Sequence, residues 1–470
     1  MRADERLLRL FQERRITFEQ RRHAPTRSLQ DAARELDMSP RQFARAVLLV
    51  ASDGTRCLAV LPADALIDFG TLQARLHADF RPATPEEVAA AFPDAQPGCV
   101  PPFGAPWSLP TVVDPALFEQ PQVCFEPGSH EEILCLSGSD FARLHEDSRQ
   151  LDFARPLSVL ATRADEDFSL PGRRVDPHLL SQLRPVEDIR ETVRRIDRLP
   201  AMPEMARRLL RLRNDPDADV RDFVAVVECD PSLTAQLIRQ ARSAFYAYGG
   251  RVDTLEQAVT RVLGFGNALD MALGLAVSRT FRNPADGPLG LQAFWKHAAA
   301  SASLAQLLTR RLPKALAPDP GVAYLAGLLH NFGFLLVGHL FRAEFFLLNR
   351  VVAANPHLPV PELEQHVLGF THTEAGGWLM EDWDMPPAIV DVVRHHHESD
   401  YAGAHATLVR LVQVVDRRLR AAGLGDAEER DLPEALLAPL GLEAAQVEAA
   451  WETLADQHEL LDALARQLAA

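Results

Sequence analysis

Histidines with carboxylate or amide side chains nearby recur in the last two thirds of this 470-residue chain. Twelve of the sixteen histidines lie after residue 170. Imidazole nitrogens and carboxylate oxygens bind divalent transition metals, and a bound metal can activate water for hydrolysis. A single histidine is usually an ordinary core or surface residue, so the order of the group and its context carry the information. In order they are His297 in FWKHA, His330-Asn331 after AYLAGLL, His372 in FTHTEAGGWL, the run 395–398 (HHHE) and Asp416 in VRLVQVVDRRL.

Two loops in the first third could contact a polar substrate. The first is Gly-Cys-Val-Pro-Pro-Phe-Gly at 98–104, and the second is Glu-Pro-Gly-Ser-His at 126–130. A stiff Gly-x-x-Pro-Pro-x-Gly loop can direct backbone N–H groups at a carbonyl or phosphate oxygen. The second loop adds a hydroxyl and an imidazole. Each loop alone is weak evidence, because proline-rich loops are commonly plain connectors.

Residues 1–150 show both helical and strand patterns, which predicts an α+β domain. The apolar positions of 6–11 favour an amphipathic helix. Two β-rich runs, 46–51 and 56–63, flank Asp53-Gly54 and predict a hairpin. Short strands fit 111–113, 123–125 and 133–136, so we expect a mixed sheet with helices. Residues 151–185 are polar and proline-punctuated, as in a linker.

The remainder of the chain is predicted to be helical. Thr254 with Gln257 forms a capping-box pattern before an apolar stripe that ends at Gly264, and Asp230-Pro231 opens another helix. No strand pattern of comparable strength follows residue 190. Apolar residues recur every three or four positions over 447–468. This predicts a helix that packs on its own domain or, alternatively, joins two copies in a homo-oligomer.

The composition indicates which partners and which cellular compartment to expect. The formal charge of −16 disfavours broad attraction to nucleic acid or an anionic membrane. Five scattered cysteines favour free thiols in a reducing cytoplasm over a disulfide framework. Residues 322–341 lack formal charges over the length of a membrane-spanning helix. Their histidines, asparagine and glycines favour a buried core helix, so we expect a cytoplasmic protein without a membrane partner.

The helical part, from about 199 to 416, resembles the HDOD branch of the HD superfamily of metal-dependent phosphohydrolases. The resemblance lies in LPAMPEMARRLLRLRNDPDADVRDFVAVVECDPSLTAQLIRQARSAFY and in GLLHNFGFLLVGHLF. It implies an all-α HDOD domain over 186–416, followed by a helical extension over 417–470. The metal-ligand positions that it implies are His297, His330, Asn331, His372, His396 (or His397) and Asp416.

This sequence departs from the active HD pattern at the centre of that set. Asn331 stands where an aspartate would bridge two cations, and Phe334 stands at the position of a lysine. Three interpretations remain open: a domain kept for contacts with a protein partner, a residual divalent-metal or ligand site without turnover, and a working phosphohydrolase. The resemblance to HDOD proteins implies a role in bacterial signalling.

Residues 5–150 resemble the YbaK/ProX-type aminoacyl-tRNA deacylases, which hydrolyse mischarged tRNA in trans. The matching motifs include ITFEQRRHAPTRSLQDAAREL, ATPEEVAAAF, GCVPPFG and CFEPGSHEEILCLS. At the position of the family lysine this chain has Arg45, whose guanidinium is planar and differently hydrated. Arg45 is therefore the candidate catalytic residue. The candidate substrate-binding residues are His23, Gly98, Pro101, Pro102, Phe103, Gly104, Gly128, Ser129 and His130.

Two functions are favoured over that of a phosphohydrolase. The first is a cytoplasmic bacterial regulator that couples a deacylase-like domain, able to bind aminoacyl-tRNA, to a non-catalytic HDOD output domain. The second is an active trans-editing deacylase that uses its helical half for recruitment or oligomerisation. No cofactor is assigned beyond the residual divalent metal.

Overall fold

The computed structural model describes most of the chain, and the chain divides into two compact units. The first unit is Met1–Arg190 with Leu347–Gly369, and the second is Glu191–Phe346 with Phe370–Ala470. The described residues are 5–22, 33, 36, 38–96, 98–130, 132–157, 160, 189, 199–242, 246, 248–277, 281, 283, 287–426 and 431–455. The predicted limits of the domains stay a prediction.

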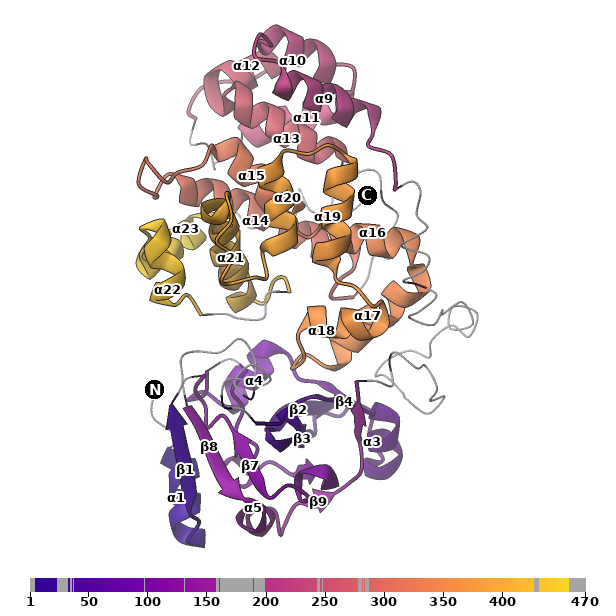
Figure 1. Cartoon of the computed structure of the whole chain (residues 1–470), viewed down its shortest axis with the longest axis vertical. Coiled ribbons are helices and arrows are strands. Elements are labelled where there is room, and N and C mark those ends of the chain that lie inside the picture. The colour runs from indigo at the N-terminus through magenta and orange to yellow at the C-terminus, as the bar shows by residue number, and fades with distance from the viewer. Residues whose placement is uncertain are drawn as a thin grey trace. The chain divides into compact units, whose positions relative to one another are not determined.

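The first unit is an α+β structure, as predicted (Figure 1). Its mixed five-stranded sheet has the order β5-β2-β3-β6-β9. A second, antiparallel sheet has the order β1-β8-β7, and β10 pairs with β4. The strands are β1 (Phe18–Arg22), β2 (Ala44–Ala51), β3 (Arg56–Pro62), β4 (Ala65–Ile67), β5 (Phe80–Pro82), β6 (Thr111–Val113), β7 (Gln122–Phe125), β8 (Glu132–Ser137), β9 (Arg149–Gln150) and β10 (Ala154–Pro156). The helices are α1 (Glu5–Arg14), α3 (Phe69–Leu76), α4 (Pro85–Ala91) and α5 (Gly138–Leu144).

Strand β2 is buried on both faces, which explains why its sequence is almost wholly apolar. Successive side chains of a strand point to opposite faces, and alternate residues of β2 join two separate apolar clusters. Ala46 and Leu48 pack in the first cluster, whereas Val47 and Leu49 pack in the second. The predicted hairpin is confirmed, since β2 and β3 pair antiparallel around a turn in which Thr55 N donates to Asp53 Oδ1 at 2.8 Å.

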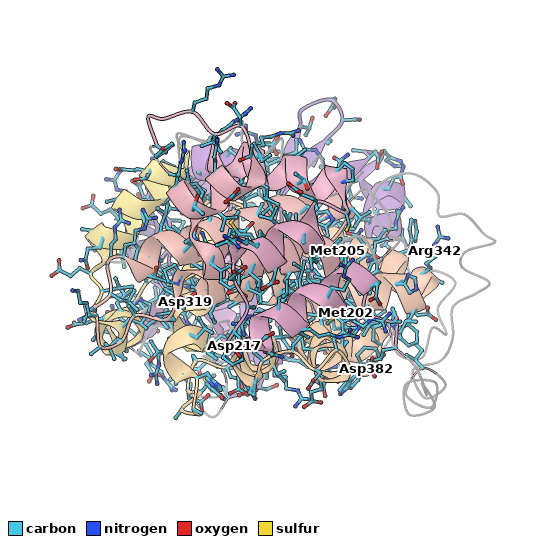
Figure 2. All side chains as sticks on the ribbon, turned by 90° about the horizontal axis from the view of Figure 1, so that it is seen from above. Met202, Met205, Asp217, Asp319, Arg342 and Asp382 are labelled. Atoms are coloured by element: carbon cyan, nitrogen blue, oxygen red, sulfur yellow. A yellow bond between two sulfur atoms is a disulfide. The ribbon has the colours of Figure 1, made fainter. Side chains whose placement is uncertain are left out.

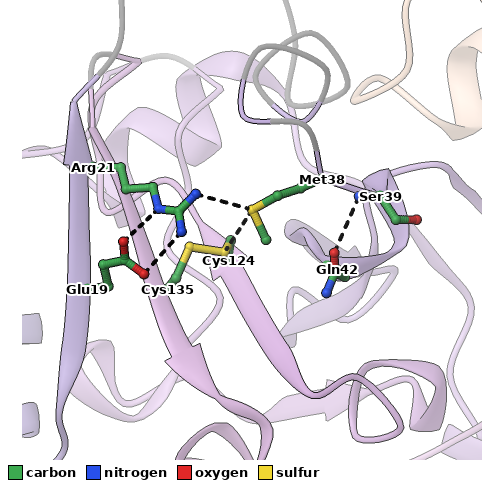
Figure 3. Close-up of a disulfide and its surroundings, with 7 residues drawn as sticks. All are labelled: Glu19, Arg21, Met38, Ser39, Gln42, Cys124 and Cys135. Atoms are coloured by element: carbon green, nitrogen blue, oxygen red, sulfur yellow. Dashed lines mark hydrogen bonds and ion pairs between the residues drawn. A yellow bond between two sulfur atoms is a disulfide. The ribbon is translucent and has the colours of Figure 1, made fainter.

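A disulfide joins two neighbouring strands of the first unit (Figure 3). Cys124 of β7 and Cys135 of β8 are direct partners in the antiparallel register, and their Sγ atoms are bonded. Met38 and the Arg21–Glu19 ion pair, 2.9 Å from Nε to Oε1, lie beside it. The expectation of free thiols was therefore wrong for these two cysteines. Sequence spacing did not reveal that pairing of the strands places them opposite each other.

The second unit is helical, as predicted, and no strand occurs among the described residues from 199 onward. Its helices are α9 (Glu204–Asn214), α10 (Val220–Val227), α11 (Pro231–Ala241), α12 (Leu255–Ala258), α13 (Phe265–Val277), α14 (Leu291–Thr309), α15 (Pro320–Leu329), α16 (Phe332–Leu340), α19 (His372–Asp382), α20 (Pro387–His395), α21 (Ala406–Ala421), α22 (Glu434–Leu437) and α23 (Ala444–Ala455). Helix α17 (Arg342–Ala354) runs from the second unit into the first, and α18 (Val360–Val367) belongs to the first.

Several helix boundaries follow the predicted signals. Thr254 Oγ1 accepts from Gln257 N at 3.2 Å, and Gly264 ends the following π-helical turn with φ +80°. Asp230 caps α11, whose first residue is Pro231. Asp319, labelled in Figure 2, caps α15 in the same way by accepting from Gly321 N at 2.8 Å. Local sequence therefore determines where these helices start and stop.

The long apolar segment lies inside the second unit. Within Pro320–Leu340, a window of 18 residues has a mean hydropathy of 1.5, and 94% of that window is buried in the protein. It comprises α15, a turn at His330-Asn331, and α16. A Cβ on Gly333 would collide with the carbonyl oxygen of His372, so glycine lets α16 pack directly on the start of α19. Burial on this scale is typical of a core helix, and this close packing brings His330, Asn331 and His372 near one another.

Candidate functional site

The six residues predicted as metal ligands converge in the second unit, and all are buried. They come from five places in the chain: α14 supplies one, the α15–α16 turn two, the start of α19 one, the end of α20 one and α21 one. They are His297, His330, Asn331, His372, His396 and Asp416. Their roles stay a prediction, but the structure places them together.

His297, His330 and Asp416 form the first of two groups whose ligand atoms lie within 4.8 Å of one another. Asp416 Oδ1 lies 3.1 Å from His297 Nε2 and 3.2 Å from His330 Nε2. His330 Nδ1 lies 2.8 Å from the carbonyl oxygen of Gly327, which can only accept, so Nδ1 carries a proton and Nε2 faces Asp416. Burial alone would lower the pKa of His330, but the charge and close contact of Asp416, together with Asp426 and the Gly327 carbonyl, outweigh burial and raise it.

His372, His396, His397 and Asp426 form the second group. Asp426 Oδ2 lies 3.2 Å from His397 Nε2 and 3.4 Å from His372 Nε2. His372 Nε2 lies 3.4 Å from His396 Nε2. Burial would raise the pKa of Asp426, but the surrounding histidines hold it well below its usual range. Burial is also the main cause that lowers the pKa of His396.

Asn331 lies between the two groups, where the HD pattern would place a bridging carboxylate. Its Nδ2 donates to Asp426 Oδ1 at 2.7 Å. A carboxylate cannot donate, so this bond fixes the amide orientation and directs Asn331 Oδ1 at His396 Nε2, 3.1 Å away. Phe334, at the lysine position, stacks on the ring of His372 with centroids 4.0 Å apart. Neither residue supplies the charge that a two-metal hydrolase needs.

Asp426 was missed from the sequence, because it follows α21 with no recognisable motif. Its position is set by Gly425, whose φ is +81°. A Cβ on Gly425 would lie 2.5 Å from His297 Nε2, so only glycine allows the chain to pass this ring. Arg420 Nη1 donates to Gly425 O at 3.0 Å and fixes the turn. The Gly-Leu-Gly-Asp sequence at 423–426 was the available signal.

The first unit holds a second polar site around Arg45 of β2. Arg45 Nη1 lies 3.3 Å from Glu126 Oε2, and Glu126 Oε1 lies 2.9 Å from His130 Nδ1. The Arg45 side chain is 17% exposed and Glu126 is buried. Burial favours neutral Glu126, but His130 and Arg45 outweigh burial and lower its pKa. Glu126 was missed, although an acidic residue that closes the apolar strand VCF was a usable signal.

Both predicted loops reach this site. A Cβ built on Gly98 would lie 3.7 Å from Arg45 Nη2 and 3.7 Å from His130 Cε1, so the Gly98 loop covers the pair. Gln96 ties this loop to the 126–130 turn, because its Oε1 accepts from His130 N at 2.8 Å and its N donates to Gly128 O at 2.9 Å. The structure therefore brings Arg45, Gly98 and His130 together.

The remaining predicted binding residues support these loops. Phe103 packs in the core between Phe125 and His145, with ring centroids 5.1 and 5.0 Å away. A Cβ on Gly104 would collide with Leu109 O, so this glycine allows close packing. Pro101, Pro102, Gly128 and Ser129 are buried beside them. His23 lies outside the described residues.

Comparisons with known proteins support both family resemblances. Residues 199–399 match the HDOD domain, and residues 23–144 match the aminoacyl-tRNA editing domain. Similar chains include a proposed signal transduction protein from Marinobacter aquaeolei VT8, whose crystal structure is 28% identical with a TM-score of 0.68, each chain covering 100% of the other. An HDOD domain protein of unknown function from Geobacter sulfurreducens is 23% identical with a TM-score of 0.49, over 60% of this chain and 97% of that one.

An uncharacterised protein from Treponema pallidum (strain Nichols) is 24% identical over 254 residues, which are 54% of this chain. The matched region is 48% of that protein, so the chain spans about half the length of this curated relative. Both family resemblances inferred from the sequence are confirmed, and so is the fold class. This chain joins an aminoacyl-tRNA editing domain to an HDOD domain.

Proposed function

We propose that the protein is a cytoplasmic bacterial regulator, in which the editing-like domain binds the aminoacylated end of tRNA and the HDOD domain acts without hydrolysis. The observation that carries the proposal is the hydrogen bond from Asn331 Nδ2 to Asp426 Oδ1. It fixes a neutral amide at the centre of the histidine cluster, where hydrolysis would require a bridging carboxylate. The Marinobacter protein, similar over its full length and described as a proposed signal transduction protein, supports a signalling role.

Burial of the cluster also supports the absence of turnover. The side chains of His330 and His372 are 0% exposed and that of Asp426 is 3% exposed. A phosphate ester would have to reach the central atoms past these side chains. A buried cluster can instead hold four helices and a turn in one arrangement, as a surface for protein contacts requires.

The editing-like site supports binding more than turnover. Arg45 keeps a positive charge beside the Gly98 loop, which suits a phosphate or a carbonyl oxygen. However, its guanidinium is paired with Glu126 at 3.3 Å, and its planar, delocalised charge differs from the compact ammonium of a lysine. We therefore expect Arg45 to bind substrate and to catalyse its hydrolysis poorly.

Binding and turnover can be measured separately. Filter binding with a non-hydrolysable aminoacyl-tRNA mimic should detect a complex that Arg45→Ala weakens at least tenfold. Arg75→Ala, at an exposed arginine of α3, is the matched control and should leave binding unchanged. Deacylation of a panel of mischarged tRNAs should be absent in the wild type. Rapid wild-type deacylation that Arg45→Ala abolishes would overturn the regulator and establish the second candidate, a trans-editing deacylase.

One observation favours that second candidate: Glu126 contacts both Arg45 and His130, beside the two predicted loops. The Arg45→Lys variant distinguishes the two. A gain of deacylation in Arg45→Lys over an inactive wild type supports a binding domain that lost its catalyst. Equal activity of both proteins supports the deacylase.

A further inference from the structure

The second histidine group has the composition of a complete metal site. Three imidazoles and one carboxylate are a common ligand set for zinc and for other divalent transition metals. The four ligand atoms lie within 4.8 Å of one another. We propose that His372, His396, His397 and Asp426 bind one divalent transition-metal cation, and that Asp426 supplies the carboxylate that position 331 lacks.

The separations between ligand atoms fit a single cation. Ligands about 2.0–2.1 Å from a tetrahedral metal lie about 3.3–3.4 Å from one another. Asp426 Oδ2 lies 3.2 Å from His397 Nε2 and 3.4 Å from His372 Nε2, and His372 Nε2 lies 3.4 Å from His396 Nε2. Three of the six separations in the set therefore match the edges of a tetrahedron.

The orientation of His396 is that of a metal ligand. Its Nδ1 lies 3.0 Å from Val393 O and 3.2 Å from Val392 O, which can only accept, so Nδ1 holds the proton of the neutral ring. Metal-binding histidines commonly donate their other N–H to a backbone carbonyl in this way. His396 Nε2 then presents a lone pair toward His372 and toward Asn331 Oδ1, 3.1 Å away. A cation beside these two facing lone pairs would relieve their repulsion in the buried site.

Asn331 acts in this site as a positioning residue. By donating to Asp426 Oδ1 at 2.7 Å, it leaves Oδ2 directed at the histidines. Asp426 lies beyond residue 399, where the match to the HDOD domain ends. The carboxylate therefore comes from the segment after α21, and the Gly425 turn against His297 fixes its position.

Four protein ligands complete a tetrahedral sphere and leave no position for a nucleophilic water, as in structural zinc sites. The cation would thus join α19, α20 and the segment after α21 without supporting hydrolysis. This inference goes beyond the proposed function. A bound metal with turnover would uphold the site and refute the regulator, whereas no bound metal would refute the site alone.

The test is metal content and affinity of the full-length protein. Protein purified without chelator should contain about one equivalent of Zn, Fe or Mn by plasma mass spectrometry. After removal with EDTA, Zn²⁺ titration against a chromogenic chelator should give one site, which Asp426→Asn weakens at least tenfold. Asp382→Asn, at an exposed carboxylate of α19, the helix that begins with His372, is the matched control and should retain that site. Visible absorption of the Co²⁺-loaded protein should report tetrahedral coordination.

Three results would overturn the assignment: a wild type that binds no metal, an Asp426→Asn variant with unchanged affinity, or an Asp382→Asn variant that loses the metal as fully as Asp426→Asn does. Circular dichroism of the EDTA-treated proteins checks that each variant folds. If Asp426→Asn does not fold, His397→Gln replaces it, because the His397 side chain is 15% exposed and the change is milder.

Discussion

Restoring the aspartate of the HD pattern at position 331 should damage this protein rather than repair it. In Asn331→Asp, a carboxylate oxygen would face Asp426 Oδ1 across the 2.7 Å now spanned by a hydrogen bond. Two unit charges at that distance repel by about 6 kcal/mol at an effective dielectric constant of about 20. A less costly solution is to bind one proton between the two carboxylates, as in paired acidic residues of other proteins.

The cost of that proton sets the expected loss of stability. To hold a proton at pH 7 on a group with an ordinary pKa of about 4 costs about 4 kcal/mol, at 1.4 kcal/mol per pH unit. The O–H···O bond that forms returns about 1 kcal/mol. We therefore expect the free energy of unfolding to fall by about 3 kcal/mol at pH 7. The raised pKa belongs to the folded state, so the deficit is present at pH 7 and shrinks as the pH falls toward 5.

Urea unfolding in EDTA measures this deficit for Asn331→Asp, Asp426→Asn and the double variant. In the double variant the hydrogen bond can re-form with donor and acceptor exchanged, so its stability should return to within about 1 kcal/mol of the wild type. An Asn331→Asp protein as stable as the wild type at pH 7 would refute the reasoning. A deficit that is independent of both pH and residue 426 would refute it equally.

Two further predictions concern the interior of each unit. Burial lowers the pKa of His145 to about 3 in the folded protein, whereas the same imidazole in the unfolded chain has a pKa of about 6.5. The unfolded chain therefore binds a proton first as the pH falls below about 6.5. The free energy of unfolding should decrease by about 2 kcal/mol between neutral pH and pH 5 for this reason. His145→Phe should remove this part of the pH dependence in urea unfolding at pH 7 and 5, and an unchanged dependence would contradict it. Gly333→Ala should lower the melting temperature, at a cost of about 2 kcal/mol or more, because its Cβ meets backbone. The matched Gly266→Ala in α13, where nothing lies within 4 Å, should be neutral or stabilising.

Patterns that act over a few residues were predictable from the sequence. The β2–β3 hairpin, the cap of α12 at Thr254 and the start of α11 at Asp230 depend on neighbours in the chain, and the structure has all three. The convergence of His297, His330, His372, His396 and Asp416 followed from the family pattern, which carries long-range information that periodicity does not.

Long-range pairing outside that pattern was not predictable. Cys124 and Cys135 are 11 residues apart and become partners only through the register of β7 and β8. Asp426 reaches the cluster because Gly425 passes the ring of His297, a contact that depends on the packing of α14 and α21. The segment Leu347–Gly369 joins the first unit, where Asn355 Oδ1 accepts from Ile67 N at 2.9 Å, and no local signal predicted this.

In both units, the residue that departs from the enzyme pattern contacts a buried acid. Arg45 pairs with Glu126, and Asn331 donates to Asp426.

Substituting the family residue at each of these two positions would have different chemical consequences. Lysine at 45 is shorter and would release Glu126 to His130 alone, which frees an ammonium for substrate. Aspartate at 331 would instead create a buried repulsion with Asp426 that only a proton, a cation or a second substitution relieves. A return to the editing pattern at 45 therefore needs one substitution, whereas a return to the HD pattern at 331 needs a second change at 426 and would still leave Phe334 at the lysine position. For this reason we expect the HDOD domain to have departed further from hydrolysis than the editing domain.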